Sequence, residues 1–184
     1  MRVFLIFGVA MLVLAISCKN NEQPSPPEAE KVVQDTLMTT AAKSKMDGGK
    51  IAQLNQQAKA ILAYRMENKP DNYAIIDVGV WEYEAAFKDG AMSKPGAYKG
   101  HWIDFDAKNG YEFGVNNDIK GRGKYHYDND THLLLLVNDD PAVKPEEYEI
   151  KLVNDVMIMM GNLTYQDNGF QAKLLKVQSR PGQQ

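Results

Sequence analysis

Apolar and polar residues alternate along most of the C-terminal part of the chain. Residues 77–88 are typical, because Trp81, Tyr83, Ala85 and Phe87 share one side while charged residues fill the other. Further short segments with alternating or continuous apolar patterns are 98–107, 111–115, 125–127, 132–137, 147–152, 156–160 and 170–177. Alternation of this kind is typical of half-buried antiparallel strands joined by short turns. The sequence therefore predicts a mainly β domain of about eight strands.

About eight strands suffice to close an antiparallel sheet into an up-and-down barrel, whose interior is filled by side chains or holds one small ligand. The inward positions are mostly aromatic, with Trp81 at the start and Phe170 near the end of the series. The candidate residues of a ligand pocket are Tyr83, Phe87, His101, Phe105, Tyr111, Phe113, Tyr125, Tyr127 and Tyr148. These residues either line a pocket or fill the barrel.

A helix is predicted over residues 50–67, within a helical lead-in that spans 31–70. Its apolar residues recur at spacings of three and four, which gives one stripe. The stripe consists of Ile51, Leu54, Ala58, Ile61 and Leu62. Pro70 ends the helix, because proline disfavours helical geometry in the preceding residue. Segment 132–137 is apolar on both faces, so we expect this helix to pack on the outer face of the barrel there.

The first 17 residues have the pattern of an export signal. A single arginine, Arg2, precedes an apolar run over 3–16 that is shorter than the roughly 20 residues of a membrane-spanning helix. The run ends in Leu14-Ala15-Ile16-Ser17-Cys18, which resembles a bacterial lipobox apart from Ala15, where leucine is usual. The resemblance implies cleavage before Cys18 and acylation of that cysteine with chains such as palmitate.

Residues 18–30 then form a polar tether with three prolines, a composition that favours an extended linker. Acyl chains on Cys18 would hold the protein to a membrane, since two or more chains anchor stably. Lys19, following the cysteine, favours the outer membrane in proteins of this type. The sequence leaves open whether the domain faces the periplasm or the cell surface.

The barrel itself has a family resemblance. Gly79-Val80-Trp81 opens the first strand and resembles the G-x-W signature of lipocalins, in which the tryptophan closes one barrel end. Arg180 follows the last strand, where lipocalins carry an arginine that packs on that tryptophan. The resemblance covers the barrel, placed at 71–180 before a short tail at 181–184. The barrel is similar to the lipocalin-like domains of Bacteroidetes-type lipoproteins, and this resemblance implies a small hydrophobic ligand.

Composition narrows the possible functions. The chain has 184 residues, 44% of them hydrophobic, and a net charge of -3, which gives no electrostatic reason to expect nucleic-acid binding. Its histidines, His101, His126 and His132, fall on different predicted strands. No nucleophile–base pair, metal-ligand cluster or calcium loop is visible in the sequence, so we expect no enzyme activity, no metal and no cofactor.

Two functions remain from the sequence. In the first, a lipid-anchored envelope protein binds a small hydrophobic ligand inside a lipocalin-like barrel. In the second, the barrel is solid and its surface docks an envelope partner whose identity the sequence leaves open.

Overall fold

The structure is a computed structural model that describes residues 48–69, 75–166 and 168–183 of the chain. Its helical elements are α1 (Gly48–Asn68) and the 3-10 helix η2 (Leu163–Tyr165). The strands are β1 (Val80–Lys88), β2 (Ala91–Met92), β3 (His101–Phe105), β4 (Gly110–Val115), β5 (Asp118–Asp128), β6 (Leu133–Asn138), β7 (Glu146–Val153), β8 (Val156–Gly161) and β9 (Phe170–Val177). In the described part of the chain no helix is long and apolar enough to span a membrane.

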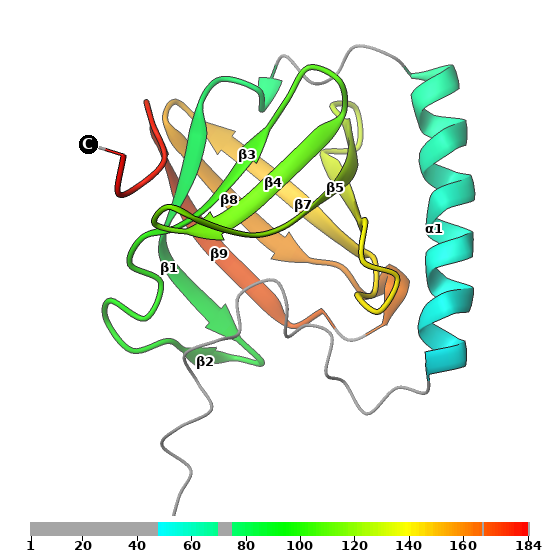
Figure 1. The fold of residues 1–184 in the computed structure, drawn as a ribbon, viewed down its shortest axis with the longest axis horizontal. Helices are drawn as coiled ribbons and strands as arrows, with labels where there is room; N and C mark the ends of the chain where they lie inside the picture. The colour runs from blue at the N-terminus through cyan, green and yellow to red at the C-terminus, as the bar shows by residue number, and fades with distance from the viewer. Residues whose placement is uncertain (1–47, 70–74, 167, 184) are drawn as a thin grey trace, which may run out of the picture. The chain divides into compact units, whose positions relative to one another are not determined.

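The strands form one antiparallel sheet that closes on itself. Each strand of the barrel pairs with its neighbour in sequence from β3 to β9, and β1 pairs with both β3 and β9 (Figure 1). The eight strands β1 and β3–β9 therefore make a closed barrel, while the two-residue β2 only extends β1 as a hairpin. The predicted up-and-down barrel of about eight strands, with a helix packed on it, is confirmed.

Trp81 lies at one end of the barrel interior. Its side chain is 1% exposed, and its indole N–H donates to the carbonyl oxygen of Ile76 over 2.9 Å. Ile76 belongs to the same core cluster and is itself buried. The segment just before β1 thus covers this end, which we call the Trp81 end.

The register of β1 changes midway along the strand. Tyr83 pairs with Leu174 and Ala85 pairs with Lys173, so Glu84 is an extra residue that forms a β-bulge. Past a bulge the inward and outward positions exchange, because side chains alternate from one residue to the next. Ala86 therefore joins the core, and the prediction that Phe87 faces the interior is wrong, since its side chain is 41% exposed.

β5 is longer than the sequence pattern suggested, because it includes Gly121 and Gly123. A Cβ atom at Gly121 would lie 2.5 Å from the Phe113 ring, and one at Gly123 would lie 2.8 Å from the Tyr111 ring. These glycines lie at inward positions of β5, and their lack of side chains makes room for two aromatic rings. The turn between β4 and β5 falls instead at Asn116, whose φ of 52° is left-handed.

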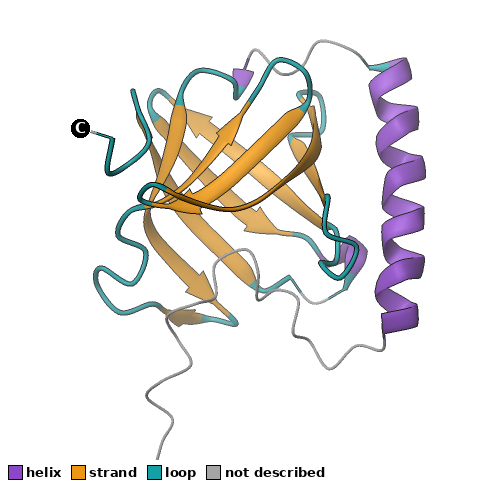
Figure 2. Ribbon diagram, viewed as in Figure 1, coloured by secondary structure: helices purple, strands orange, loops and turns teal. Residues whose placement is uncertain are grey.

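Helix α1 packs on the outer face of the barrel (Figure 2). Its apolar stripe contributes Ala58 and Leu62 to a second buried cluster with Leu135 and Val137, two outward residues of β6. The predicted cover for this doubly apolar strand is therefore present. Tyr165, from η2, completes the buried part of the cluster.

Polar contacts fix the position of α1 on the barrel. The Asn55 amide N–H group donates to the carbonyl oxygens of Pro141 and Val143 at 3.0 and 2.9 Å. Arg65 forms an ion pair with Glu147 of β7, at 3.0 Å between Nη1 and Oε1. Because these bonds need a specific alignment, they fix the helix more precisely than apolar packing alone would.

Gly79 lies just before β1, where β1 pairs with β9 to close the barrel, and it provides a test of that closure. Its φ is +136°, and a Cβ atom there would lie 3.0 Å from the carbonyl oxygen of Val177. We expect Gly79→Ala to lower the free energy of unfolding by about 1–3 kcal/mol, because only glycine adopts this backbone region without strain. Urea denaturation measures the change. Gly48→Ala, where a Cβ meets nothing within 4 Å, is the control, and an equal effect of both substitutions would contradict this account.

Candidate functional site

The register of β1 and β9 defines the two ends of the barrel. Register places Val80 and Val177 at the Trp81 end, because they pair with each other beside Gly79. Lys88 and Phe170 also pair with each other, at the opposite end of the same two strands. Glu146 begins β7, whose last residue lies by the Trp81 end, so Glu146 lies at the opposite end too. We call this opposite end the distal end.

Aromatic rings gather inside the distal end. The ring centroid of Phe170 lies 6.3 Å from that of Tyr83, 6.3 Å from that of Tyr98 and 6.4 Å from that of Tyr148. Tyr98 also lies 6.2 Å from Tyr83 and 5.7 Å from His101. These separations are those of rings in contact. Tyr98, Phe170 and His101 are half-buried, so the cluster extends from the core to the barrel edge.

Glu146 is a carboxyl group inside the barrel. It pairs with Leu136, and its strand alternates so that Glu146 and Tyr148 share the inward face. The Tyr148 hydroxyl donates to Glu146 Oε2 over 2.6 Å, and both side chains are buried. Burial raises the pKa of Glu146, although the Tyr148 hydrogen bond and the charges of Lys144 and Lys88 oppose that rise.

The hydroxyl group of Tyr83 is buried without a partner. The residue is 4% exposed, and within the described part of the chain its oxygen makes no hydrogen bond. Burial raises the pKa of Tyr83, and the nearby Glu146, Tyr98 and Tyr111 raise it further. A buried polar group left unsatisfied costs about 1–3 kcal/mol. Tyr83 is therefore a position where a further polar group would be stabilising.

Four of the predicted pocket residues pack against one another in pairs inside the barrel. Phe105 and Tyr125 have ring centroids 4.9 Å apart, and Tyr111 stacks on Phe113 at 6.2 Å. Each of these four side chains is at most 5% exposed. Their close packing shows that they contribute to the core of the barrel.

The hydroxyl groups of Tyr125 and Tyr127 contact residues of turns. The Tyr125 hydroxyl donates to the carbonyl oxygen of Asp106 at 2.9 Å. The Tyr127 hydroxyl lies 3.4 Å from His132 Nδ1. Of the nine predicted pocket residues, ring contacts bring together Tyr83, His101 and Tyr148 at the distal end, and Tyr111 lies near enough to Tyr83 and Glu146 to interact with both electrostatically.

The sequence prediction missed Glu146 and Tyr98. The sequence holds a signal for Glu146, because it lies two residues before Tyr148, a predicted inward residue, and strand side chains alternate with a period of two. A carboxylate was not expected inside a barrel, since burying an unpaired charge is costly. Tyr98 falls within the predicted strand segment 98–107, but β3 begins only at His101, and in the loop before it strand periodicity carries no information about direction.

His101 and His126 do not converge. His126 points outward beneath α1, where its Nε2 lies 3.1 Å from the carbonyl oxygen of Lys69. Burial lowers the pKa of both histidines, with a smaller contribution from Lys120 at His101. Among the described residues, no group of three His, Cys, Asp or Glu side chains is arranged to hold a metal ion.

Arg180 packs on a different tryptophan from the one expected. Its guanidinium carbon lies 4.4 Å from the ring centroid of Trp102, an outward residue of β3. The same group bonds Asp104 at 3.0 Å and Glu112 at 2.8 Å. The expectation that Arg180 packs on Trp81 is therefore corrected. Trp102 lies on the outer surface of β3, where the C-terminal segment reaches it, whereas Trp81 is inside.

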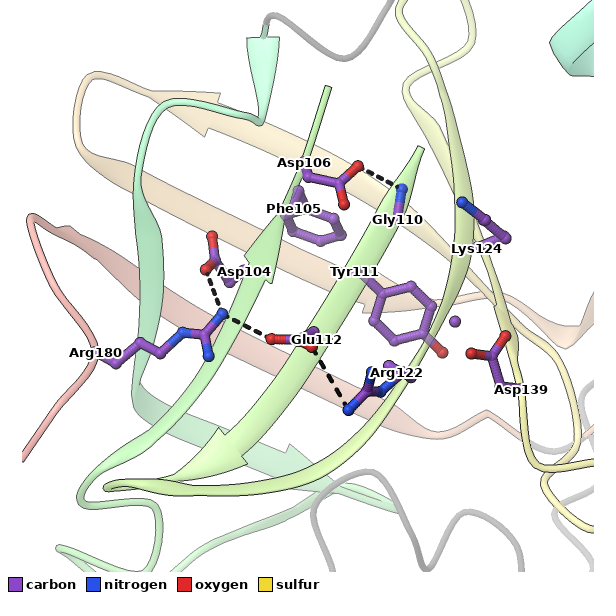
Figure 3. A pocket seen from close by; sticks show the side chains of 11 residues that line it. Asp104, Phe105, Asp106, Gly110, Tyr111, Glu112, Arg122, Lys124, Asp139 and Arg180 are labelled. Atoms are coloured by element: carbon purple, nitrogen blue, oxygen red, sulfur yellow. Dashed lines mark hydrogen bonds and ion pairs between the residues drawn. The ribbon is translucent and has the colours of Figure 1, made fainter. Parts of the chain in front are cut away.

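Arg180 also lines a cleft of about 290 Å³ at β3, β4 and β5, where charged outward side chains adjoin the rings of Phe105 and Tyr111 (Figure 3). Glu112 lies between Arg180 and Arg122, so opposite charges face one another across the cleft (Figure 3). Lys124 and Asp139 add one further charge of each sign to the lining. A cleft of this character does not suit an apolar ligand.

Comparison with known proteins finds weak similarity to solved structures only. No protein-family model matches the chain, and no curated protein sequence is significantly similar to it. A DUF4847 family protein from Bacteroides vulgatus is 9% identical with a TM-score of 0.43, over 59% of this chain and 99% of its own. An uncharacterized protein from Bacteroides eggerthii is 12% identical with a TM-score of 0.42, over 55% and 99%. At these values neither similarity carries an argument about function.

The buried Glu146 predicts a pH dependence of stability. As pH rises above the unfolded-state pKa of about 4.3, the unfolded chain releases this proton before the folded chain does. The stability contributed by the protonated carboxyl is therefore present at low pH and lost as pH rises through the folded-state pKa. We expect the free energy of unfolding of the native protein to fall relative to Glu146→Gln as pH rises above about 4.3 and through the raised folded-state pKa of Glu146.

Urea denaturation across this pH series measures the difference. The control is Glu149→Gln, an exposed position on the same strand, which should leave the pH profile unchanged. Parallel profiles for the native protein and Glu146→Gln would show that Glu146 does not titrate differently on folding.

Proposed function

We propose that this protein is a lipid-anchored protein of the cell envelope whose barrel binds a small hydrophobic ligand at the distal end. It acts as a binding protein and not as an enzyme. The proposal combines two parts of the chain: the N-terminal residues up to Cys18, which lie outside the described residues, and the barrel.

The proposed anchor rests on the sequence around Cys18. An apolar leader that ends in a small residue and a cysteine supports acylation of that cysteine. Lys19 supports delivery to the outer membrane. The proline-containing segment after it supports a tether that holds the barrel away from the membrane surface.

The ligand-binding part rests on the cluster at the distal end. The rings of Tyr98, His101 and Phe170 are half-buried at the barrel edge. Further inside lies the buried hydroxyl of Tyr83, which has no hydrogen-bond partner among the described residues. Apolar sites with a few convergent polar groups are typical of small-molecule binding. The unsatisfied Tyr83 hydroxyl is the observation that favours a ligand over a solid core, because a filled barrel gains nothing from it.

The alternative of a solid barrel that docks a partner has less support. This alternative rests on the two strands that are apolar on both faces, β6 and β8. Helix α1 covers Leu135 and Val137 on the first of these, β6. On β8, the outward residues Val156, Ile158 and Met160 are half-buried, so only this second strand leaves part of its outer apolar face open.

The anchor is testable by metabolic labelling. In bacterial cells that express the full chain and are fed an alkyne analogue of palmitate, we expect label on the native protein and none on Cys18→Ser. The reason is that the thiol of Cys18 is the only one in the chain. Ser17→Ala keeps a small residue before the cysteine and should label normally. Label on Cys18→Ser equal to that of the native protein would contradict the anchor.

Ligand binding is testable by native mass spectrometry of the full chain purified from envelope membranes. We expect a bound lipophile as an added mass that organic extraction removes. Ala172 pairs with Met159 and faces the interior, so Ala172→Leu should fill the site and abolish the added mass.

Ala91→Leu is the matched control, because Ala91 is exposed in β2 outside the barrel. A cooperative thermal transition for both variants shows that they fold. If the native protein carries no extractable lipophile, or if Ala172→Leu retains it, binding at this site is wrong.

A further inference from the structure

The distal end contains polar groups in a specific arrangement, and these restrict the chemistry of a ligand. Tyr83 comes from β1, whereas Glu146 and Tyr148 come from β7. Tyr148 and Glu146 satisfy each other through a hydrogen bond of 2.6 Å, but the Tyr83 hydroxyl has no partner among the described residues. Tyr83 is 4% exposed, so bulk water does not reach its hydroxyl freely.

Charges of both signs surround this site. Where Glu146 is ionised it repels a ligand carboxylate or phosphate placed beside it, and where it is protonated a buried ligand anion still loses its hydration. Lys144 is buried near the same end, with its ammonium group donating to the carbonyl oxygen of Gln166 at 2.8 Å. Lys144 and Lys88 both act electrostatically on Glu146, so their positive charges disfavour a cationic ligand group. A neutral polar group meets neither penalty.

Among neutral groups, a hydroxyl matches the available partners best. Tyr83 offers a donor and an acceptor, and the Glu146 carboxyl has acceptor capacity beyond the one bond from Tyr148. A hydroxyl accepts one hydrogen bond and donates another, whereas a ketone or ester carbonyl only accepts. A hydroxyl also fits either protonation state of Glu146, because it can reverse its direction of donation.

We propose that the ligand of the distal end is an uncharged amphiphile ending in a hydroxyl group, which hydrogen-bonds the Tyr83 hydroxyl and the Glu146 carboxyl. Its hydrocarbon part lies against the rings of Tyr98 and Phe170 and extends toward the barrel edge. This inference rests on the proposed function, since it names the class of ligand for the same site.

Photocrosslinking tests the inference with the full chain held in phosphatidylcholine nanodiscs. The probes are a diazirine-bearing long-chain fatty alcohol and the fatty acid of the same chain length, used near neutral pH. We expect the alcohol to label barrel peptides at about tenfold lower concentration than the acid, the effect of one well-made hydrogen bond or one avoided charge contact.

Tyr83→Phe removes the proposed partner while retaining the ring. We expect it to raise the alcohol concentration needed for half-maximal labelling by about tenfold and to change labelling by the acid little. Tyr127→Phe is the matched control, because Tyr127 is also an interior tyrosine but its hydroxyl lies beside His132. That variant should label as the native protein does, and a cooperative thermal transition shows that each variant folds.

The outcomes separate this inference from the proposed function. If neither probe labels peptides of the distal end, binding of a lipophile there fails, and the inference fails with it. If both probes label equally, if the acid labels better, or if Tyr83→Phe behaves as Tyr127→Phe does, the hydroxyl preference is wrong while lipophile binding stands.

Discussion

Pairing of β1 with β9 is the interaction on which the rest of the structure depends. It joins the first and last barrel strands from Val80 and Val177 to Lys88 and Phe170, and so leaves neither long strand as an open edge. An unpaired edge would expose a row of backbone donors and acceptors and invite aggregation. Closure also creates an interior with two ends. The close approach of Gly79 to Val177 and the burial of Trp81 both occur where this seam begins.

The bulge at Glu84 connects closure to the candidate site. Beyond it, the small residues Ala86 and Ala172 face inward as a pair, where the unbroken alternation would have placed Phe87. Small side chains at these positions leave volume within the distal half of the barrel for the rings of Tyr83 and Phe170. A strand without the bulge would direct a third large ring into the same space. The irregularity therefore shapes the part of the interior in which the unsatisfied hydroxyl lies.

The sequence predicted the barrel and the covering helix because both follow from periodicity, which burial enforces directly. It failed where a local event breaks the period or where polar groups take inward positions. The Glu84 bulge reversed the orientation of Phe87, and the predicted strand over 125–127 left out the β5 glycines, which accommodate aromatic rings. Arg180 was assigned by family resemblance, yet its contact depends on how the C-terminal segment crosses the outside of β3. Such three-dimensional proximity leaves no trace in residue spacing.

The polar groups of the distal end are difficult to explain as packing alone. A phenylalanine at position 83 would fill nearly the same volume as Tyr83 without burying an unsatisfied hydroxyl. A glutamine at position 146 could still accept the Tyr148 hydrogen bond without the cost of a buried acid. Each group costs folding free energy where an uncharged or apolar substitute was available, and the two interact electrostatically. Polar groups that are costly in the empty barrel become favourable once a ligand hydrogen-bonds them, which links the stability of the fold to occupancy of the site.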